Sequence, residues 1–381
     1  MTRRSDFEKL TARFPLRADL VRLLAAVGAG VFCLALSTSG AIPETSVPSN
    51  RLSSSFDFSY VVRVSPAPGT RSVRAWIPLP STDEFQEISE VRIEAPVRVR
   101  MRKEAKYGDR YAYFTVDSSR IQAPFEIRLT FHVVRYERRL DLVSAIDPPG
   151  AFPKDVAAFL QPDKLVPTDG AIASAAQEQT HGLASPLEKA RGIYEYLIST
   201  MRYDREDAGA GRGDALWAFG SHRGNCADFH SLFIAMARAA GIPARFEIGF
   251  LLPEGQKEGI VSGYHSWAEF YVNGIGWIPV DASQASQDPS KRDDFFGAID
   301  ARRVMVSMGR DIAVMPAPEA GSLNYIVYPY IEMDRKSSPS YSVDFFFNEV
   351  GFNSATPSVV RKPIFAGGRS MVPGRSLRLP S

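Results

Sequence analysis

Residues 224–230 read Gly224-Asn225-Cys226-Ala227-Asp228-Phe229-His230 and begin a segment whose apolar residues recur at helical spacing. Cys226 is one of two cysteines in the 381-residue chain, and the other, Cys33, lies in the N-terminal leader. Once the leader is removed, the thiol of Cys226 has no partner for an internal disulfide. It is therefore either a buried small apolar residue or a reactive group.

The first 41 residues have the pattern of an export signal. Five arginines precede an apolar run from Leu23 to Leu36, and small residues follow up to Ala41, where we expect cleavage. The run is shorter than the roughly 17–25 residues of a transmembrane helix, although the adjacent Leu20 and Val21 would lengthen an uncleaved anchor. We therefore expect an exported protein that is periplasmic, secreted or held at the membrane by its signal.

The composition is that of a globular chain without a polyanion partner. Apolar residues make up 45% and charged residues 23%, and the length allows two domains. Six basic and three acidic residues lie within residues 1–41, which leaves 39 basic and 40 acidic residues in the rest. Such a balance gives no reason to expect nucleic acid binding.

Residues 42–140 are predicted to form an antiparallel β-sandwich. Apolar and polar residues alternate in four short runs that are separated by proline- and glycine-containing turns: 56–62, 73–77, 111–116 and 125–131. The following segment, 141–184, is rich in turn residues and is predicted to be a connector with one short helix.

Residues 185–330 are predicted to form a mixed α+β domain. A helix should begin after Ser185, where a hydroxyl cap, a proline and Glu188 follow in order, and a second near Cys226. Strands should follow over 244–250, 264–272 and 277–281. Beyond them we expect a C-terminal β extension over 331–354, with a hairpin between 323–332 and 341–347, and a flexible basic tail over 355–381.

Cys226, His265 and Asp281 follow one another in an order that suits a nucleophile, a base and an orienting acid. A helix N-terminus favours a thiolate because its first N–H groups have no acceptor within the helix. The same position offers the backbone N–H of Cys226 to an oxyanion, and the indole of Trp217 is a candidate second donor. His265 would take the thiol proton, and Asp281 would fix the imidazole tautomer.

The connection between the last two strands tests this assignment. A two-residue turn at Gly274 and Ile275 would place Asp281 opposite Ala268, so that His265 would point to the other face of the sheet. A connection with an odd number of residues, or a bulge, would bring both side chains to one face. We therefore predict an odd loop or a bulge here.

Three segments together resemble the bacterial transglutaminase-like family: 223–233, 264–270 and 276–283. The resemblance extends over about residues 185–330. It implies a papain-like fold and acyl-enzyme chemistry, with Cys226 matching the nucleophile, His265 the base and Asp281 the orienting acid. It does not choose between hydrolysis and transfer, because the family includes amide-forming transferases, peptidases and amidases.

The resemblance also shapes our expectations about ligands. Animal transglutaminases need calcium, but this chain has no spaced acidic loop, so we expect no metal and no cofactor. The expected partner is a protein or peptide substrate with an amide donor group, with envelope association through the leader.

Three other interpretations stay open at this point. His230 follows Cys226 by four residues and is a rival base. His222, Cys226 and His230 are spaced by four and would suit a zinc site, although Gly224 interrupts the helix. The chain as a whole is alternatively a surface or cell-wall binding module that keeps the fold without the chemistry.

Overall fold

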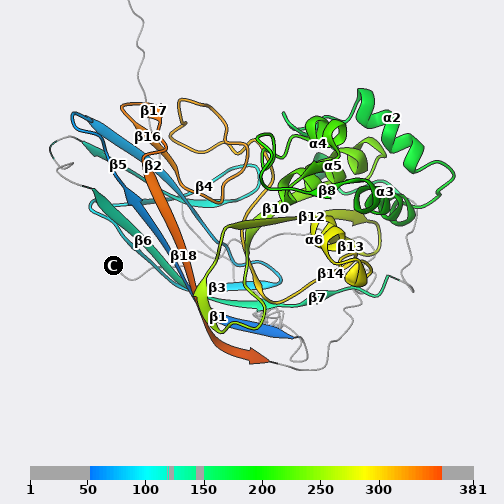
Figure 1. The fold of residues 1–381 in the computed structure, drawn as a ribbon, viewed down its shortest axis with the longest axis horizontal. Helices are drawn as coiled ribbons and strands as arrows, with labels where there is room; N and C mark the ends of the chain where they lie inside the picture. Colours follow the sequence, from blue (N-terminus) through cyan, green and yellow to red (C-terminus); the bar gives the residue numbers. More distant parts are fainter. Residues whose placement is uncertain (1–51, 118, 120–123, 143–149, 354–381) are drawn as a thin grey trace, which may run out of the picture. The chain divides into compact units, whose positions relative to one another are not determined.

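The computed structural model describes residues 52–117, 119, 124–142 and 150–353 (Figure 1). The predicted leader, with Cys33, and the predicted tail over 355–381 lie outside the described residues. The described residues belong to one compact unit. None of the helices in these ranges is both long and apolar enough to cross a membrane.

Two five-stranded antiparallel sheets form a β-sandwich, which confirms the predicted N-terminal fold (Figure 1). The first sheet has the order β11-β18-β1-β6-β3 and the second β17-β16-β2-β5-β4. Their inner faces share one apolar core because alternate residues of a strand point to the same side. The strands are β1 Ser53–Val64, β2 Ser72–Leu79, β3 Gln86–Glu94, β4 Arg100–Lys103, β5 Arg110–Asp117, β6 Phe125–Tyr136, β11 Glu258–Ile260, β16 Tyr330–Met333, β17 Lys336–Ser337 and β18 Tyr341–Asn353.

The expected hairpin between 323–332 and 341–347 does not form. β16 pairs with β2 and β17 in one sheet, whereas β18 pairs with β1 along its whole length in the other. Each strand thus extends a different N-terminal sheet. The turn residues at 336–339 were misleading, because the 13-residue strand β18 forms more backbone hydrogen bonds with the long strand β1 than it could with the four-residue strand β16.

The remaining elements build an α+β core domain around a four-stranded sheet, β13-β12-β10-β15. Its strands are β10 Ala244–Leu251, β12 Tyr264–Val272, β13 Gly276–Val280 and β15 Arg303–Met308. The helices are α1 Lys154–Ala157, the 3₁₀ turn Ala158–Leu160, α2 Gly170–Gln179, α3 Pro186–Thr200, α4 Ala215–Ser221, α5 Cys226–Ala239, α6 Ala282–Gln287 and the 3₁₀ turn Pro289–Lys291. Two short pairs complete the fold: β7 Arg138–Arg139 with β14 Ala298–Ile299, and β8 Arg202–Tyr203 with β9 Arg223–Gly224.

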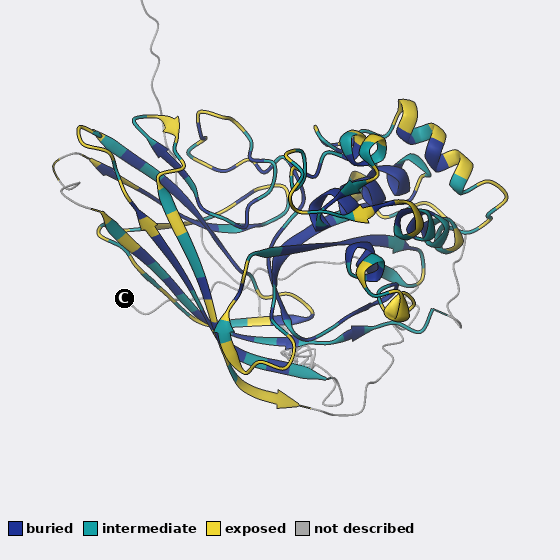
Figure 2. Cartoon of the chain, viewed as in Figure 1, coloured by how far each residue is buried: buried dark blue, intermediate teal, exposed yellow. Residues whose placement is uncertain are grey.

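Helix α5 lies at the centre of this domain. Every residue from Cys226 to Arg238 is buried, and most of α5 is dark blue at the place that Figure 1 labels (Figure 2). The helix packs against β10 and β12, where the rings of Phe233 and Phe270 are 6.0 Å apart. A helix buried on all sides holds its first residue in a fixed position relative to the sheet.

The core domain and the sandwich share one apolar core. The ring of Phe250 on β10 stacks on that of Phe58 on β1 at 5.1 Å and lies 4.3 Å from that of Phe345 on β18. The sheet that carries the site is thus packed directly against the sandwich.

Candidate active site

Cys226 is the first residue of α5, and its side chain is 1% exposed. The side chain of Asn225 caps the helix by accepting from the N–H of Ala227, and the carboxylate of Asp228 accepts from the N–H of Asn225 at 2.9 Å. These reciprocal bonds form a capping box and fix where the helix begins. The thiol therefore lies at the positive end of the helix dipole.

His265 lies on β12, and Asp281 directly follows the adjacent strand β13 as the N-cap of α6; their side chains are in direct contact. Nε2 of His265 is 2.6 Å from Oδ2 of Asp281. Val272 pairs with Gly276, so three residues connect β12 and β13. This odd loop confirms the predicted connection and explains why both side chains reach the same side of the sheet.

The thiol of Cys226 interacts with His265 and Ser266 at the start of β12. Burial raises the pKa of the thiol, but the imidazole of His265, the hydroxyl of Ser266 and the Ser266 backbone hold it below the usual value. Among the described residues, the Ser266 hydroxyl has no other hydrogen-bond partner. Because Nε2 of His265 faces Asp281, Nδ1 is the nitrogen available to the thiol.

The pKa of His265 moves in the opposite direction. Burial lowers it, but the Asp281 carboxylate and the Cys226 thiol outweigh burial and raise it to about 9. A lowered thiol pKa beside a raised imidazole pKa favours a thiolate and imidazolium pair near neutral pH.

Asp281 is fully buried, and four groups compensate its charge. Its Oδ1 accepts from the Ser283 hydroxyl at 2.9 Å and from the N–H of Gln284 at 3.1 Å. Its Oδ2 lies 3.2 Å from Nη1 of Arg303 as well as near His265. Burial raises the pKa of Asp281, but His265, His230 and Arg303 hold it far below the usual value. The carboxylate therefore stays ionised.

His230 is turned away from a role as base. Its Nδ1 donates to the backbone carbonyl of Cys226 at 2.7 Å, and its Nε2 is 3.5 Å from Oδ1 of Asp281. Burial lowers its pKa to about 4, against the opposing charge of Asp281. At neutral pH the ring is therefore uncharged and supports the first turn of α5.

The zinc interpretation finds no support in the described part of the chain. His222 ends α4 in a left-handed conformation with its ring 6.3 Å from that of Phe219, and His230 is engaged with Cys226 and Asp281. Within the described ranges, no three His, Cys, Asp or Glu side chains are grouped so that they could hold a metal ion.

Trp217 lies on α4 with its indole against Gly209. A Cβ at Gly209 would come within 2.5 Å of Nε1, so the glycine makes room for the ring. Within the described residues, no hydrogen bond engages Nε1 or joins the indole to Cys226. Its role as an oxyanion donor therefore stays a proposal.

Several side chains around the site had no signal in the sequence. Arg303 is buried beside Asp281, although it lies outside the three recognised segments. Ser266 contacts the thiol, whereas the alternation of residues along the strand predicts only that its side chain faces the core. Tyr203 and Arg205 lie in a loop-rich segment without a motif. Only the fold brings these residues to Cys226.

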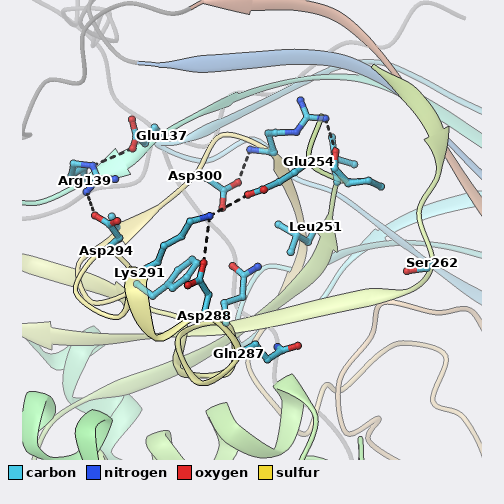
Figure 3. Close-up of a pocket in the computed structure, with 16 residues that line it drawn as sticks. Glu137, Arg139, Leu251, Glu254, Ser262, Gln287, Asp288, Lys291, Asp294 and Asp300 are labelled. Atoms are coloured by element: carbon cyan, nitrogen blue, oxygen red, sulfur yellow. Dashed lines mark hydrogen bonds and ion pairs between the residues drawn. The ribbon is translucent and has the colours of Figure 1, made fainter. Parts of the chain in front are cut away.

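A cavity of about 680 Å³ borders the site on the side of α6 (Figure 3). Gln284, whose N–H donates to Asp281, belongs to its lining, and Cys226, His265 and Asp281 do not. Its charges are largely paired, as Figure 3 shows for Arg139 with Asp294 and Lys291 with Asp288. All of its charged lining residues are paired within the described part of the chain, so the cavity offers no free charge to a ligand.

Residues 173–282 match the family model of the transglutaminase-like superfamily. An uncharacterized protein of Haemophilus influenzae is 27% identical over 297 residues, which cover 68% of this chain and 80% of that protein. The uncharacterized protein YebA of Bacillus subtilis is 27% identical over 119 residues, or 28% of this chain and 16% of YebA. A solved structure of a candidate cysteine protease from Cytophaga hutchinsonii covers 83% of this chain and 96% of its own with a TM-score of 0.58 at 16% identity, which shows a shared fold.

Residues 173–282 are therefore similar to the core domain of the transglutaminase-like superfamily. This chain carries a transglutaminase-like core domain that contains Cys226, His265 and Asp281 and packs against a β-sandwich.

Proposed function

We propose that the protein is an exported cysteine acyl-transfer enzyme that attacks a carboxamide or peptide bond and forms a thioester on Cys226. The observation that supports this most strongly is the contact chain from thiol to His265 to Asp281, with the thiol pKa lowered and the imidazole pKa raised to about 9. Export is proposed from the leader sequence, and a protein or peptide substrate from the chemistry.

In the first step, the thiolate of Cys226 attacks the carbonyl carbon. The C–N bond breaks, and the imidazolium of His265 gives its proton to the leaving nitrogen, which departs as an amine or, from a carboxamide, as ammonia. The backbone N–H of Cys226 would stabilise the oxyanion. The Nε1–H of Trp217, which makes no hydrogen bond within the described residues, is the proposed second donor.

In the second step, water or a primary amine attacks the thioester. His265 takes a proton from that nucleophile, and the C–S bond breaks to restore the thiolate. Asp281 accepts from Nε2 throughout and stabilises the imidazolium. Water gives an amidase or peptidase and an amine gives a transglutaminase, and both remain within the proposal.

The decisive test is the pH dependence of Cys226 alkylation, measured by mass spectrometry on the wild type and His265→Ala. We expect the thiol to titrate below the free-cysteine value of about 8.5 in the wild type and to return toward it in the variant. A thiol with an ordinary pKa that the variant leaves unchanged would contradict the proposal and favour the non-catalytic binding module.

A second experiment separates the two enzyme classes. Glutamine-containing peptides are incubated with the protein, with and without a primary amine, beside Cys226→Ser as control. Ammonia release with incorporation of the amine would indicate a transferase. Cleavage of the backbone alone would indicate a peptidase.

A further inference from the structure

Residues 202–213 form a strap across the N-terminus of α5. At its start, β8 pairs in parallel with β9, and the N–H of Asp204 donates to the carbonyl of Gly224 at 2.9 Å. At its end, the N–H groups of Gly211 and Gly213 donate to the carboxylate of Asp228 at 2.7 and 2.8 Å. The strap is therefore fixed on both sides of the helix start that carries Cys226.

Tyr203 and Arg205 project from this strap as one unit. The ring of Tyr203 packs against that of Phe229 at 6.2 Å, and Phe229 lies within one turn of Cys226. Nε of Arg205 donates to the Tyr203 hydroxyl at 2.9 Å, and its guanidinium carbon lies 5.5 Å from the ring centre. Tyr203 thus positions the guanidinium next to the start of α5.

Arg205 differs from the other arginines around the strap in its partners. Arg202 pairs with Asp204, Arg212 with Asp214 and Arg223 with Asp207. Arg205 is exposed and, among the described residues, forms no ion pair with a carboxylate. Its two Nη groups therefore keep donors for an incoming anion.

The electrostatics link this guanidinium to the nucleophile. Burial lowers the pKa of Arg205, but the Tyr203 hydroxyl and the charges of Cys226 and Tyr264 outweigh burial and raise it. Burial raises the pKa of Tyr203 to about 12, and the charge of Cys226 adds to this effect. Both side chains therefore lie within the field of the thiolate.

We propose that Arg205 is a specificity-determining residue that binds a carboxylate of the acyl donor, so that the enzyme prefers peptides with an acidic group beside the attacked carbonyl. A guanidinium suits this task because its planar donors match a carboxylate in a bidentate geometry. The substrate preference in this inference rests on the proposed acyl-transfer function. The anion site at Arg205 does not.

The first test uses two alkylating probes that differ in charge, iodoacetate and iodoacetamide. The ratio of their rates at Cys226 reports whether a cation attracts an anion to the thiol, and it needs no turnover. In Arg205→Gln we expect this ratio to fall several-fold, and in Arg205→Lys to stay near the wild-type value. Arg202→Gln is the matched control, because Arg202 lies on the same strap but is paired with Asp204.

An equal ratio in Arg205→Gln, Arg202→Gln and the wild type would overturn the inference. Thermal unfolding of each variant verifies that the variant is folded. The His265 imidazolium also attracts iodoacetate, but it is present in all of these variants, so their differences isolate Arg205.

The second test compares matched peptides with Glu or Gln at the residue next to the attacked carbonyl. We expect the wild type and Arg202→Gln to favour the Glu peptide by about tenfold in kcat/KM, and Arg205→Gln to lose this preference. Turnover of both peptides at equal rates would refute the inference and leave the proposed function intact. A falling alkylation ratio without turnover of any peptide would support the anion site and refute the proposed function.

Discussion

Nη1 of Arg303 lies 3.2 Å from Oδ2 of Asp281, the same oxygen that Nε2 of His265 approaches to 2.6 Å. All three side chains are buried, and Arg303 also donates to Asp300 at 2.7 Å and to Gln284 at 3.1 Å. The carboxylate that orients the imidazole is thus held by a second cation. This arrangement keeps Asp281 in place whether His265 is charged or neutral.

Replacing Arg303 by Gln should destabilise the fold. Removing one partner of a buried ion pair leaves an uncompensated charge, which costs about 3–5 kcal/mol. Urea unfolding of Arg303→Gln should show this loss. Arg292→Gln is the control, because its ion pair with Glu195 is exposed and should cost less than about 1 kcal/mol. Equal losses in the two variants would contradict the predicted role.

Replacing Asp281 by Asn should remove the negative charge beside the His265 imidazole while keeping a side chain of the same size in its place. The pKa of His265 should fall from about 9 toward its ordinary value, because its largest favourable partner loses its charge. The pKa of the Cys226 thiol should rise in response. We expect kcat on a peptide substrate to fall by about 10⁴-fold, as it does when other triad carboxylates are neutralised. Alkylation rates measured against pH would report both shifts, and an unchanged profile would exclude Asp281 as the orienting acid.

His230 should make the protein less stable in mild acid. Its native pKa of about 4 lies below the unfolded value of 6.5, so the unfolded chain binds a proton that the native state excludes. This single group should therefore remove about 3 kcal/mol of stability as the pH falls from about 6.5 to about 4.

The comparison of His230→Asn with the wild type isolates this effect. Asparagine keeps an N–H for the Cys226 carbonyl but cannot be protonated in this range. The difference in unfolding free energy between the two proteins should change with pH only below about 6.5. His265 contributes the opposite trend in both proteins, since its raised pKa adds stability that is lost as the pH rises through about 9. A pH-independent difference would contradict the assignment of a neutral His230.

Replacing Trp217 by Phe should separate oxyanion binding from thiol activation. The variant keeps a ring against Gly209 but loses the N–H. If the indole is the second oxyanion donor, kcat should fall by about 10²–10³-fold. The alkylation profile of Cys226 should stay unchanged, because alkylation develops no oxyanion. Trp277→Phe serves as control, since Trp277 packs against Tyr271 and Arg245. Equal kcat values in both variants would remove Trp217 from the mechanism.

The sequence anticipates the parts of this molecule that depend on local patterns. The capping box at Ser185 and the start of α5 at Cys226 occur where the cap residues predict them. The odd loop at residues 273–275 could be predicted because strand periodicity, combined with the assumption that His265 and Asp281 share one face, excludes a two-residue turn. The order of Cys226, His265 and Asp281 is also informative, because the sequence predicts a helix that begins at Cys226 and strands that contain His265 and Asp281.

The parts that were missed depend on long-range contacts. Arg303 has no local pattern that distinguishes a buried ion pair from a surface charge. β3 was not predicted because a register shift between Ser89 and Arg92 interrupts its period of two, so that Ile88 and Ile93 lie five residues apart. The pairing of β18 with β1 joins residues far apart in the chain, which no turn signal can report.

The position of β18 has a consequence for how the chain reaches its native state. β18 lies between β1 and β11 in the first sheet, so residues up to Asn353 must be available before this sheet can close. Such distant pairings slow folding and delay closure of the first sheet until residue 353 has been synthesised. We therefore expect β1 of the nascent polypeptide to lack its β18 partner, and to stay accessible to proteases and chaperones, until then. For the export proposed above, this delay would extend the time during which the chain can be translocated across a membrane.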